Sequence, residues 1–173
     1  MTTVTHEDLL RQLDYCSETG IFRWKVNRKN TKVQAGDIAG TPHKVNRYRY
    51  IYLNSKLYFE HRLAWFYVYG VWPVNQIDHK NQDRTDNRIN NLREASNAQN
   101  ASNRTVLSNN TSGFKGVTWD RNRNKWRAKL IWNNKTISLG NHTCPIEAAR
   151  AYDSKALELH GEFAVTNASL GLI

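Results

Sequence analysis

The residues of this sequence best suited to chemistry lie together at positions 77–100, IDHKNQDRTDNRINNLREASNAQN. This stretch is rich in asparagine, aspartate and arginine, and it carries one adjacent carboxylate and imidazole, Asp78 and His79. Hydrolysis of a phosphodiester needs a divalent cation to stabilise the departing oxygen and a general base to activate water. A carboxylate beside a histidine offers one candidate for each role.

A calcium site or a plain polar turn could also account for such a polar stretch. Its oxygen donors alternate over residues 81–85, as in a calcium-binding EF-hand loop, but Asp86 and Leu92 replace the glycine and glutamate that such a loop needs. The calcium hypothesis therefore fails. A polar turn whose side chains hold their own backbone explains the composition, but it does not explain the adjacent carboxylate and imidazole.

The flanking residues predict the elements that would position these groups. Residues 76–79 (QIDH) suit the end of a strand, and residues 88–93 (RINNLR) suit a return strand. Residues 96–104 (SNAQNASNR) suit a short helix capped by its first serine. Asn100, one turn after this cap, would then face Asp78 and offer a second oxygen ligand.

These segments resemble the HNH, or ββα-metal, nuclease motif in the form found in phage-encoded homing endonucleases. Such proteins show HRL, DH, TDNR, NL and a helical asparagine, which stand here at residues 61–63, 78–79, 85–88, 91–92 and 100. The resemblance implies that Asp78 and Asn100 ligate the metal and that His79 is the general base. It also implies that Asn91 braces the loop that aims the imidazole, and that the protein is a mobile endonuclease encoded by a phage.

The implied ligands also predict the metal. Both are oxygen donors, so we expect one Mg²⁺ or Mn²⁺ per active site rather than Zn²⁺. Asn97, three residues earlier on the same helix face, is the alternative to Asn100. Arg88 and Arg93 are candidates to hold the scissile phosphate, or else belong to a solvated surface. His61 is expected to pack among aromatic side chains rather than to bind metal.

A second pattern, after a small and polar stretch, points to nucleic-acid binding. Three strands are predicted at residues 114–119, 125–132 and 135–140, and a helix at residues 143–161. The middle strand alternates between an apolar face with two tryptophans and a largely basic face. The helix is expected to cover the tryptophan face with the stripe Ile146, Ala149, Tyr152, Ala156 and Leu159 or Leu157. The basic face must then look outward, where it could enter a major groove.

Residues 113–167 resemble an AP2/ERF DNA-binding domain. The shared features are GV in the first strand, KW and A in the second, LG closing the third, and the later segments EAARAYD and HGEFAVTN. The resemblance implies DNA contacts by Lys115, Thr118, Lys129, Thr136 and Ser138. Because side chains alternate along the strand at 125–132, Arg127 is expected on the same outward face. Phosphate contacts are expected from Arg121, Arg123 and Lys135. Plant members carry arginine or tryptophan at several of these positions, where this chain does not.

Charge favours a polyanionic partner. The 173 residues include 25 Lys and Arg against 15 Asp and Glu, a formal net charge of +10. Residues 21–56 include nine basic residues and one acidic residue. Residues 104–135 include eight basic residues and one acidic residue. Two such segments suggest two contacts with a phosphate backbone, although each could also be a solvated face.

Other classes of protein are disfavoured. No apolar stretch reaches membrane length and the first residues do not resemble a signal peptide, so we expect a cytoplasmic protein, in the host bacterium if phage-encoded. Cys16 and Cys144 lie far apart without a CxxC pair, which argues against a zinc site or a disulfide framework. Both are expected to be buried thiols.

The predicted fold is α+β: a ββα-metal nuclease domain followed by a small AP2-like domain, a three-stranded antiparallel sheet packed on one helix. The expected divisions are a basic, strand-rich segment at 1–60, the nuclease core at 61–103, a linker at 104–113 and the AP2-like domain at 114–168. Within the first segment we expect a helix at 6–14, a strand at 21–26 and a hairpin of 47–53 with 57–59. A helix at 60–70 should end at Gly70.

The predicted function is metal-dependent cleavage of double-stranded DNA at a site addressed by the AP2-like domain. A monomer with one site is expected to nick, whereas a dimer on DNA would cut both strands. The alternatives are a sequence-specific DNA-binding regulator with an inactive nuclease motif, and an RNA-binding or structural phage protein. Binding alone would not separate these, because all of them bind polyanions, but metal-dependent cleavage would.

Overall fold

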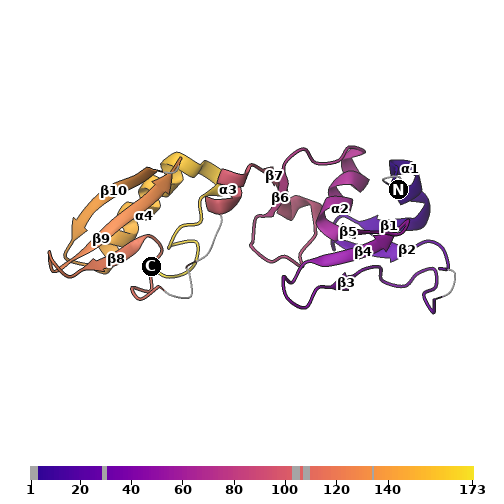
Figure 1. Ribbon diagram of the computed structural model, residues 1–173, viewed down its shortest axis with the longest axis horizontal. Coiled ribbons are helices and arrows are strands. Elements are labelled where there is room, and N and C mark those ends of the chain that lie inside the picture. The colour runs from indigo at the N-terminus through magenta and orange to yellow at the C-terminus, as the bar shows by residue number, and fades with distance from the viewer. Residues whose placement is uncertain (1–3, 29–30, 103–105, 107–109, 134) are drawn as a thin grey trace. The chain divides into compact units, whose positions relative to one another are not determined.

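A computed structural model of the chain describes residues 4–28, 31–102, 106, 110–133 and 135–173. It contains two compact units, Met1–Ala95 and Ser96–Ile173 (Figure 1). Both mix helices with antiparallel strands, so the predicted α+β class is confirmed. Within these ranges, no helix combines the length and the apolar character that a membrane crossing requires.

The first unit is built from two hairpins, a three-stranded sheet and two helices. In chain order its elements are α1 (His6–Gln12), β1 (Leu13–Cys16), β2 (Ile21–Trp24), β3 (Thr41–Pro42), β4 (Arg49–Leu53), β5 (Lys56–Phe59), α2 (Glu60–Tyr69), β6 (Gln76–His79), the 3₁₀ turn η1 (Ile89–Asn91) and β7 (Leu92–Ala95). β1 pairs with β2, β4 lies between β3 and β5, and β6 pairs with β7, all antiparallel.

Local signals explain where these elements begin and end. Thr5 caps α1 by accepting a hydrogen bond from the Asp8 amide at 3.1 Å. Gly70 ends α2 in the left-handed conformation, with φ of 72°, as the sequence predicted. The hairpin of β4 and β5 turns at Asn54 and Ser55, whose φ angles of 46° and 63° are typical of two-residue turns.

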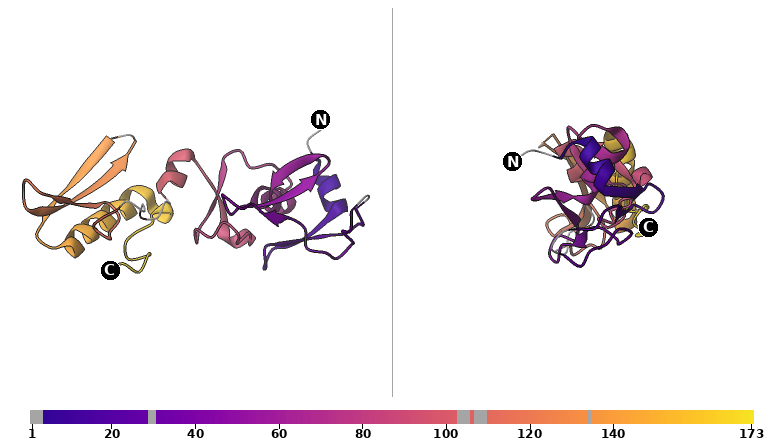
Figure 2. Two further views of the ribbon diagram at one scale, coloured as in Figure 1. Left: turned by 60° about the horizontal axis from the view of Figure 1, so that its bottom comes forward. Right: turned by 90° about the vertical axis from the view of Figure 1, so that its right-hand side faces the viewer.

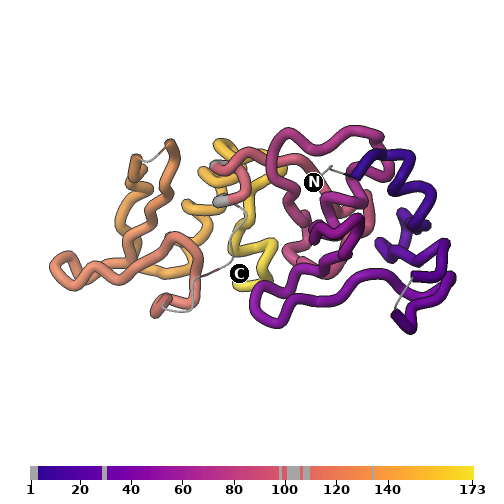
Figure 3. The backbone as a smooth tube through the Cα atoms, turned by 45° about the vertical axis from the view of Figure 1, so that its right-hand side comes forward, coloured from indigo at the N-terminus to yellow at the C-terminus, as the bar shows by residue number. Residues whose placement is uncertain are grey.

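One hydrophobic core joins both helices and every strand of the first unit except β3. It includes Phe22 from β2, Leu63 from α2, Ile77 from β6 and Leu92 from β7, and α1 lies against α2 (Figure 3). The β6–β7 hairpin is therefore anchored to the body of the unit through its apolar side chains. The predicted return strand at 88–93 is wrong in its start, because η1 occupies its first half and the strand begins only at Leu92.

The second unit is a three-stranded sheet with one long helix on it. Its elements are α3 (Asn97–Ser102), β8 (Val117–Asp120), β9 (Lys125–Trp132), β10 (Lys135–His142), α4 (Pro145–His160) and the 3₁₀ turn η2 (Gly161–Phe163). The antiparallel sheet has the order β10-β9-β8. α4 contacts all three strands and covers one face of the sheet (Figure 2), so the architecture predicted for this region is confirmed.

Details of α4 differ from the prediction. The helix begins at Pro145, two residues later than predicted, and the side chain of its cap residue Cys144 makes no capping hydrogen bond. Ile146 and Leu157, proposed for the buried stripe, are 42% and 56% exposed, whereas Leu159 packs against the core. Ala148 joins the core in place of Ile146, while Ala149, Tyr152 and Ala156 are buried as predicted.

Both cysteines are free thiols, but neither is fully buried. Cys16 is exposed and Cys144 half-buried, so the prediction of two buried thiols is wrong. Cys16 ends a hairpin strand whose alternate side chains face outward.

The boundary between the two units falls between Ala95 and Ser96, within the stretch expected to be the nuclease core at 61–103. Half of the predicted linker at 104–113 lies outside the described residues. The domain limits expected from the sequence therefore stay predictions.

Candidate active site and nucleic-acid interface

The end of β6 presents the adjacent carboxylate and imidazole. Asp78 and His79 are 5% and 4% exposed, and Arg93 on β7 is the register partner of Asp78. The Arg93 guanidinium donates to Asp78 Oδ2 from Nε at 3.0 Å and from Nη2 at 2.9 Å. This pairing offsets the cost of burying the carboxylate. It also engages the arginine that was a candidate to hold phosphate.

The imidazole of His79 is held by a side-chain amide. Its Nε2 lies 3.1 Å from Asn87 Oδ1, and Asn87 Nδ2 donates to Glu60 Oε2 at 3.2 Å. Burial lowers the pKa of His79 below its ordinary value, and the contact with Asn87 partly opposes that shift. The ring is therefore neutral at pH 7, which is the form that can accept a proton from water.

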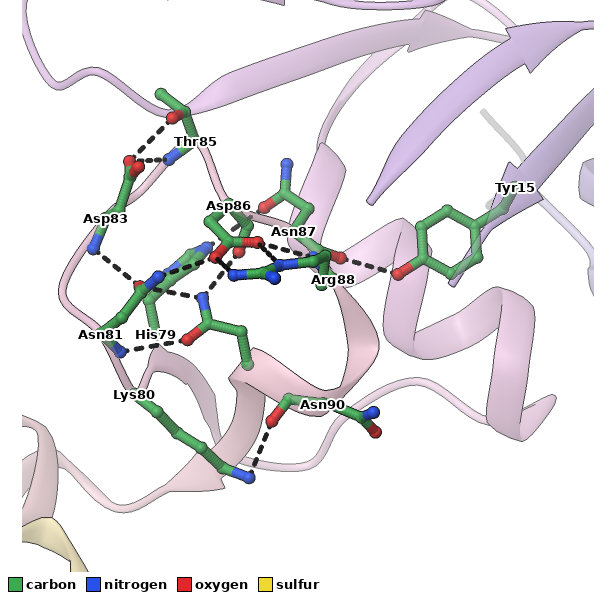
Figure 4. Close-up of polar contacts among 11 residues, drawn as sticks. Tyr15, His79, Lys80, Asn81, Asp83, Thr85, Asp86, Asn87, Arg88 and Asn90 are labelled. Atoms are coloured by element: carbon green, nitrogen blue, oxygen red, sulfur yellow. Dashed lines mark hydrogen bonds and ion pairs between the residues drawn. The ribbon is translucent and has the colours of Figure 1, made fainter. Parts of the chain in front are cut away.

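Asn91 braces the loop between β6 and η1. Its Oδ1 accepts from the Asn81 amide at 3.0 Å, and its Nδ2 donates to Asn81 Oδ1 at 2.9 Å and to the Asp86 carbonyl at 2.8 Å. Within the same loop Arg88 binds the Asp86 carboxylate and lowers its pKa to about 2 (Figure 4). The loop that follows the imidazole is thus closed on itself by side-chain hydrogen bonds.

Aromatic rings surround the imidazole. The ring centroids of His61 and Tyr48 lie 5.2 and 6.0 Å from that of His79, and the Arg84 guanidinium lies over Tyr48 at 5.0 Å. Burial, and after it the nearby His79, lowers the pKa of His61 to about 3. His61 is therefore a packed, neutral histidine, as the sequence predicted.

Asn100, the second expected ligand, lies on α3. Ser96 caps this helix by accepting from the Gln99 amide at 3.3 Å, while Gln99 Oε1 accepts from the Ser96 amide at 2.8 Å, a capping box. The predicted serine cap is confirmed. Asn100 is half-buried and Asn97 is exposed. Because α3 belongs to the second unit, the meeting of Asn100 with Asp78 stays a prediction.

The donor chemistry of this pair fits a hard divalent cation. Asp78 supplies a buried carboxylate at a strand end and Asn100 a carboxamide oxygen, the ligands that Mg²⁺ and Mn²⁺ prefer. In the part of the chain that the structure describes, no three His, Cys, Asp or Glu side chains are grouped as metal ligands. A site whose two protein ligands are one aspartate and one asparagine contains no such group of three side chains.

The outward face of the β8–β10 sheet gathers most of the residues expected to contact DNA. Thr118 pairs across the strands with Arg127, Lys129 with Ser138, and Ile131 with Thr136. Trp126, Ala128, Leu130 and Trp132 alternate with them and pack toward α4, so the predicted division of β9 into two faces is confirmed. Exposed side chains at the ends of the strands complete the set: Arg121, Arg123 and Lys135. Arg123 also binds Asp120 at 3.0 Å.

Lys115 differs from the other residues of this set. Its ammonium donates to the Val165 carbonyl at 3.0 Å and lies 5.9 Å from the centroid of Tyr152. Burial lowers its pKa to about 8. Lys115, which lies before β8, therefore binds the C-terminal segment, and a contact with DNA stays a prediction for this residue.

Sequence reasoning missed two residues near the imidazole, Glu60 and Asn87. Both are 1% exposed, and together they connect the start of α2 with the end of β6. The burial of Glu60 cannot be read from the sequence, whereas Asn87 lies in the TDNR segment at 85–88, where it had been given no role.

Comparisons with known proteins agree with this division. A family described as HNH endonuclease matches residues 58–102, and one described as AP2 domain matches residues 112–162. Protein 3.8 of Escherichia phage T7 is 32% identical over 105 residues, 60% of this chain and 86% of that protein. An uncharacterised HNH endonuclease, L560, of Acanthamoeba polyphaga mimivirus is 32% identical over 91 residues, 53% of this chain and 46% of that protein. The ethylene-responsive transcription factor WRI1 of Arabidopsis thaliana is 37% identical over 63 residues, 35% of this chain and 15% of that protein.

Proposed function

Because this chain belongs to the HNH endonuclease family and carries an AP2 domain after its HNH endonuclease domain, we propose that it hydrolyses phosphodiester bonds of double-stranded DNA. The observation that supports this most directly is the pair Asp78 and His79 at the end of β6. Both are buried, and the imidazole is neutral. A carboxylate that can bind a cation thus stands beside a base that can accept a proton.

In the proposed reaction His79 is the general base. It takes one proton from a water molecule, whose oxygen attacks phosphorus as the bond to the 3′ oxygen breaks. The hydrogen bond with Asn87 holds the ring while it becomes an imidazolium. Asn91 acts at a distance, because its three hydrogen bonds to Asn81 and Asp86 fix the loop directly after the histidine.

One Mg²⁺ or Mn²⁺ per site is part of the proposal, with Asp78 and Asn100 as its protein ligands. When bound, such an ion would supply charge for the phosphate and the departing oxygen. Arg93 orients the Asp78 carboxylate through its two hydrogen bonds.

The AP2 sheet is proposed to supply the address. Its outward face carries cations and hydroxyl groups from three adjacent strands, and a major groove admits such a sheet. A cutting site tethered to a sequence reader raises the local concentration of the site at its target. The similarity to a phage protein is consistent with a homing-type endonuclease, and a monomer with one site would nick.

The test is cleavage of supercoiled plasmid that carries the genomic neighbourhood of the protein, in Mg²⁺, in Mn²⁺ and in EDTA. We expect nicking in the presence of either metal and its loss in His79→Ala. The matched control is His160→Ala, which removes a histidine at the end of α4 in the other unit. Loss of nicking in both variants would contradict the role of His79.

A second candidate function is a DNA-binding regulator with an inactive nuclease site. The pairing of Arg93 with Asp78 favours it, because the guanidinium engages the oxygen Oδ2 that a cation would otherwise share. Site-selective binding without cleavage under any metal would support this candidate and contradict the nuclease.

A further inference from the structure

We propose that Glu60 is a positioning residue for His79, which it controls through the side-chain amide of Asn87 by fixing which imidazole nitrogen carries the proton. The inference rests on the proposed role of His79 as general base. It concerns a residue outside the stretch at 77–100 in which the sequence places the active site.

Three buried side chains form a continuous chain of hydrogen bonds. Glu60 stands at the start of α2, Asn87 two residues before η1, and His79 at the end of β6. Glu60 Oε2 and Asn87 Nδ2 are 3.2 Å apart, and Asn87 Oδ1 and His79 Nε2 are 3.1 Å apart. All three are less than 5% exposed.

Donor and acceptor rules make this chain directional. An ionised carboxylate only accepts hydrogen bonds, so it draws the NH₂ end of Asn87 toward Glu60. The carbonyl end then faces His79, and because it too only accepts, Nε2 of the ring has to carry the hydrogen. The lone pair that can accept a proton from water is thereby placed on Nδ1. With the amide reversed, the other tautomer would be favoured.

Other residues of the first unit hold Glu60 and Asn87 in place. Arg49 Nε lies 2.5 Å from Glu60 Oε2, and its Nη2 donates to the carbonyls of Ala39 and Gly40 at 3.1 and 3.2 Å. The Asn87 carbonyl accepts from the Tyr15 hydroxyl at 2.7 Å (Figure 4). Glu60 and Asn87 are thus held by residues that lie far in sequence from the stretch at 77–100.

A purely structural role for Glu60 would predict the same contacts. Arg49 and Glu60 form a buried ion pair, and Asn87 could simply complete its hydrogen bonding. Stability measurements cannot distinguish a structural role from a positioning role. The tautomer of His79 can, because a structural ion pair has no reason to select an imidazole nitrogen.

The first measurement is therefore the tautomer of His79, read from long-range ¹H–¹⁵N NMR correlations of the full chain at pH 8, without DNA or metal. His79→Ala identifies the signals among the six histidines. We expect the Nε2–H form in the native chain and in Glu60→Gln, which keeps an acceptor. We expect a mixture or the Nδ1–H form in the double variant Arg49→Met/Glu60→Leu, in which apolar groups replace the ion pair.

Controls test whether the tautomer depends on the hydrogen bonds that connect Glu60, Asn87 and His79. Arg49→Lys keeps a cation beside Glu60, and with it the ionised acceptor, and should keep the Nε2–H form. Adding Asn87→Asp to the double variant places an acceptor against His79 again and should restore that form. Should the double variant fail to fold, Glu60→Ala replaces it with the same expectation. An unchanged tautomer in the folded variant without Glu60 would overturn the proposal.

Activity gives the second measurement. Loss of the Glu60 acceptor should lower kcat by about 10- to 100-fold, the effect typical of a lost orienting partner, with KM unchanged. A native chain that cleaves no DNA would overturn the proposed nuclease function but would leave the tautomer result standing. A selected tautomer whose loss leaves kcat unchanged would overturn the positioning role while the nuclease function stands.

Discussion

Asp78 and Arg93 face each other across the β6–β7 ladder, and both hydrogen bonds of the guanidinium to the carboxylate converge on Oδ2, at 3.0 and 2.9 Å. The side chains are 5% and 11% exposed. An ion pair this buried is expensive to break on one side only, because the remaining charge is left without its partner. A bound cation could replace that partner.

Arg93→Met is therefore expected to destabilise the first unit by about 3 kcal/mol in EDTA, the usual effect of removing one member of a buried pair. If Asp78 is a metal ligand, Mn²⁺ should recover a large part of this loss, since binding to the folded state stabilises it. Urea unfolding in EDTA and in Mn²⁺ measures both effects. Asp78→Asn/Arg93→Met is the control, and equal recovery in that variant would contradict metal binding at Asp78.

Asn91→Ala is expected to loosen the loop after His79. The change removes three hydrogen bonds to Asn81 and Asp86 and should lower the free energy of unfolding by about 1–3 kcal/mol. Amide exchange at Asn81 should become faster, and DNA nicking slower. Asn90→Ala is the matched control, because that side chain is exposed and its backbone carbonyl, which Lys80 binds, is kept. Similar exchange in the two variants would show that Asn91 does not brace the loop.

Much of this fold could be predicted because the relevant signals are local. The alternation along residues 125–132 assigned both faces of β9, Gly70 marked the end of α2, and Ser96 marked the start of α3. Each of these features depends on residues within a few positions of one another, which is the range over which sequence periodicity and capping act.

The connections within the site could not be predicted in the same way. Glu60 and Asn87 are 27 residues apart, and their contact depends on how α2 packs against the loop before η1. The pairing of Asp78 with Arg93 depends on the register of β6 against β7, which is set by where the return strand begins after η1. Lys115 faces inward because of Val165, fifty residues later.

Stability should respond to pH in opposite directions at two neighbouring residues. Burial raises the pKa of Glu60 to about 7 from an ordinary 4.5, so its contribution to stability is full below pH 4.5 and is lost as pH rises to 7. Burial lowers the pKa of His61 to about 3 from 6.5, so its contribution is full above pH 6.5 and is lost as pH falls to 3. Between pH 4.5 and 6.5 the two effects oppose each other.

Single substitutions should reveal how each residue makes the free energy of unfolding depend on pH. Relative to the native chain, the free energy of unfolding of Glu60→Gln should rise with pH by about 1.4 kcal/mol per unit between pH 4.5 and 6.5. That of His61→Phe should fall by a similar amount per unit. Urea unfolding at several pH values measures both, and slopes of the same sign would contradict the raised pKa of Glu60 or the lowered pKa of His61.

The last prediction concerns DNA binding by the outward face of the AP2 sheet. Arg127 lies on this face, opposite Thr118 and Asn141, and its side chain is exposed. If it binds a phosphate, Arg127→Ala should lower the slope of log K against log salt by about 1. Fluorescence anisotropy with duplex DNA at several salt concentrations measures that slope.

Arg150→Ala separates a phosphate contact from a general effect of charge. Arg150 is exposed on α4, the helix that covers the other face of the sheet, so its removal changes the net charge equally. We expect its slope to equal that of the native chain, since an unbound cation releases no counterion from DNA. Equal decreases in the two variants would mean that net charge governs binding, and the sheet would lose its assignment as the reading surface.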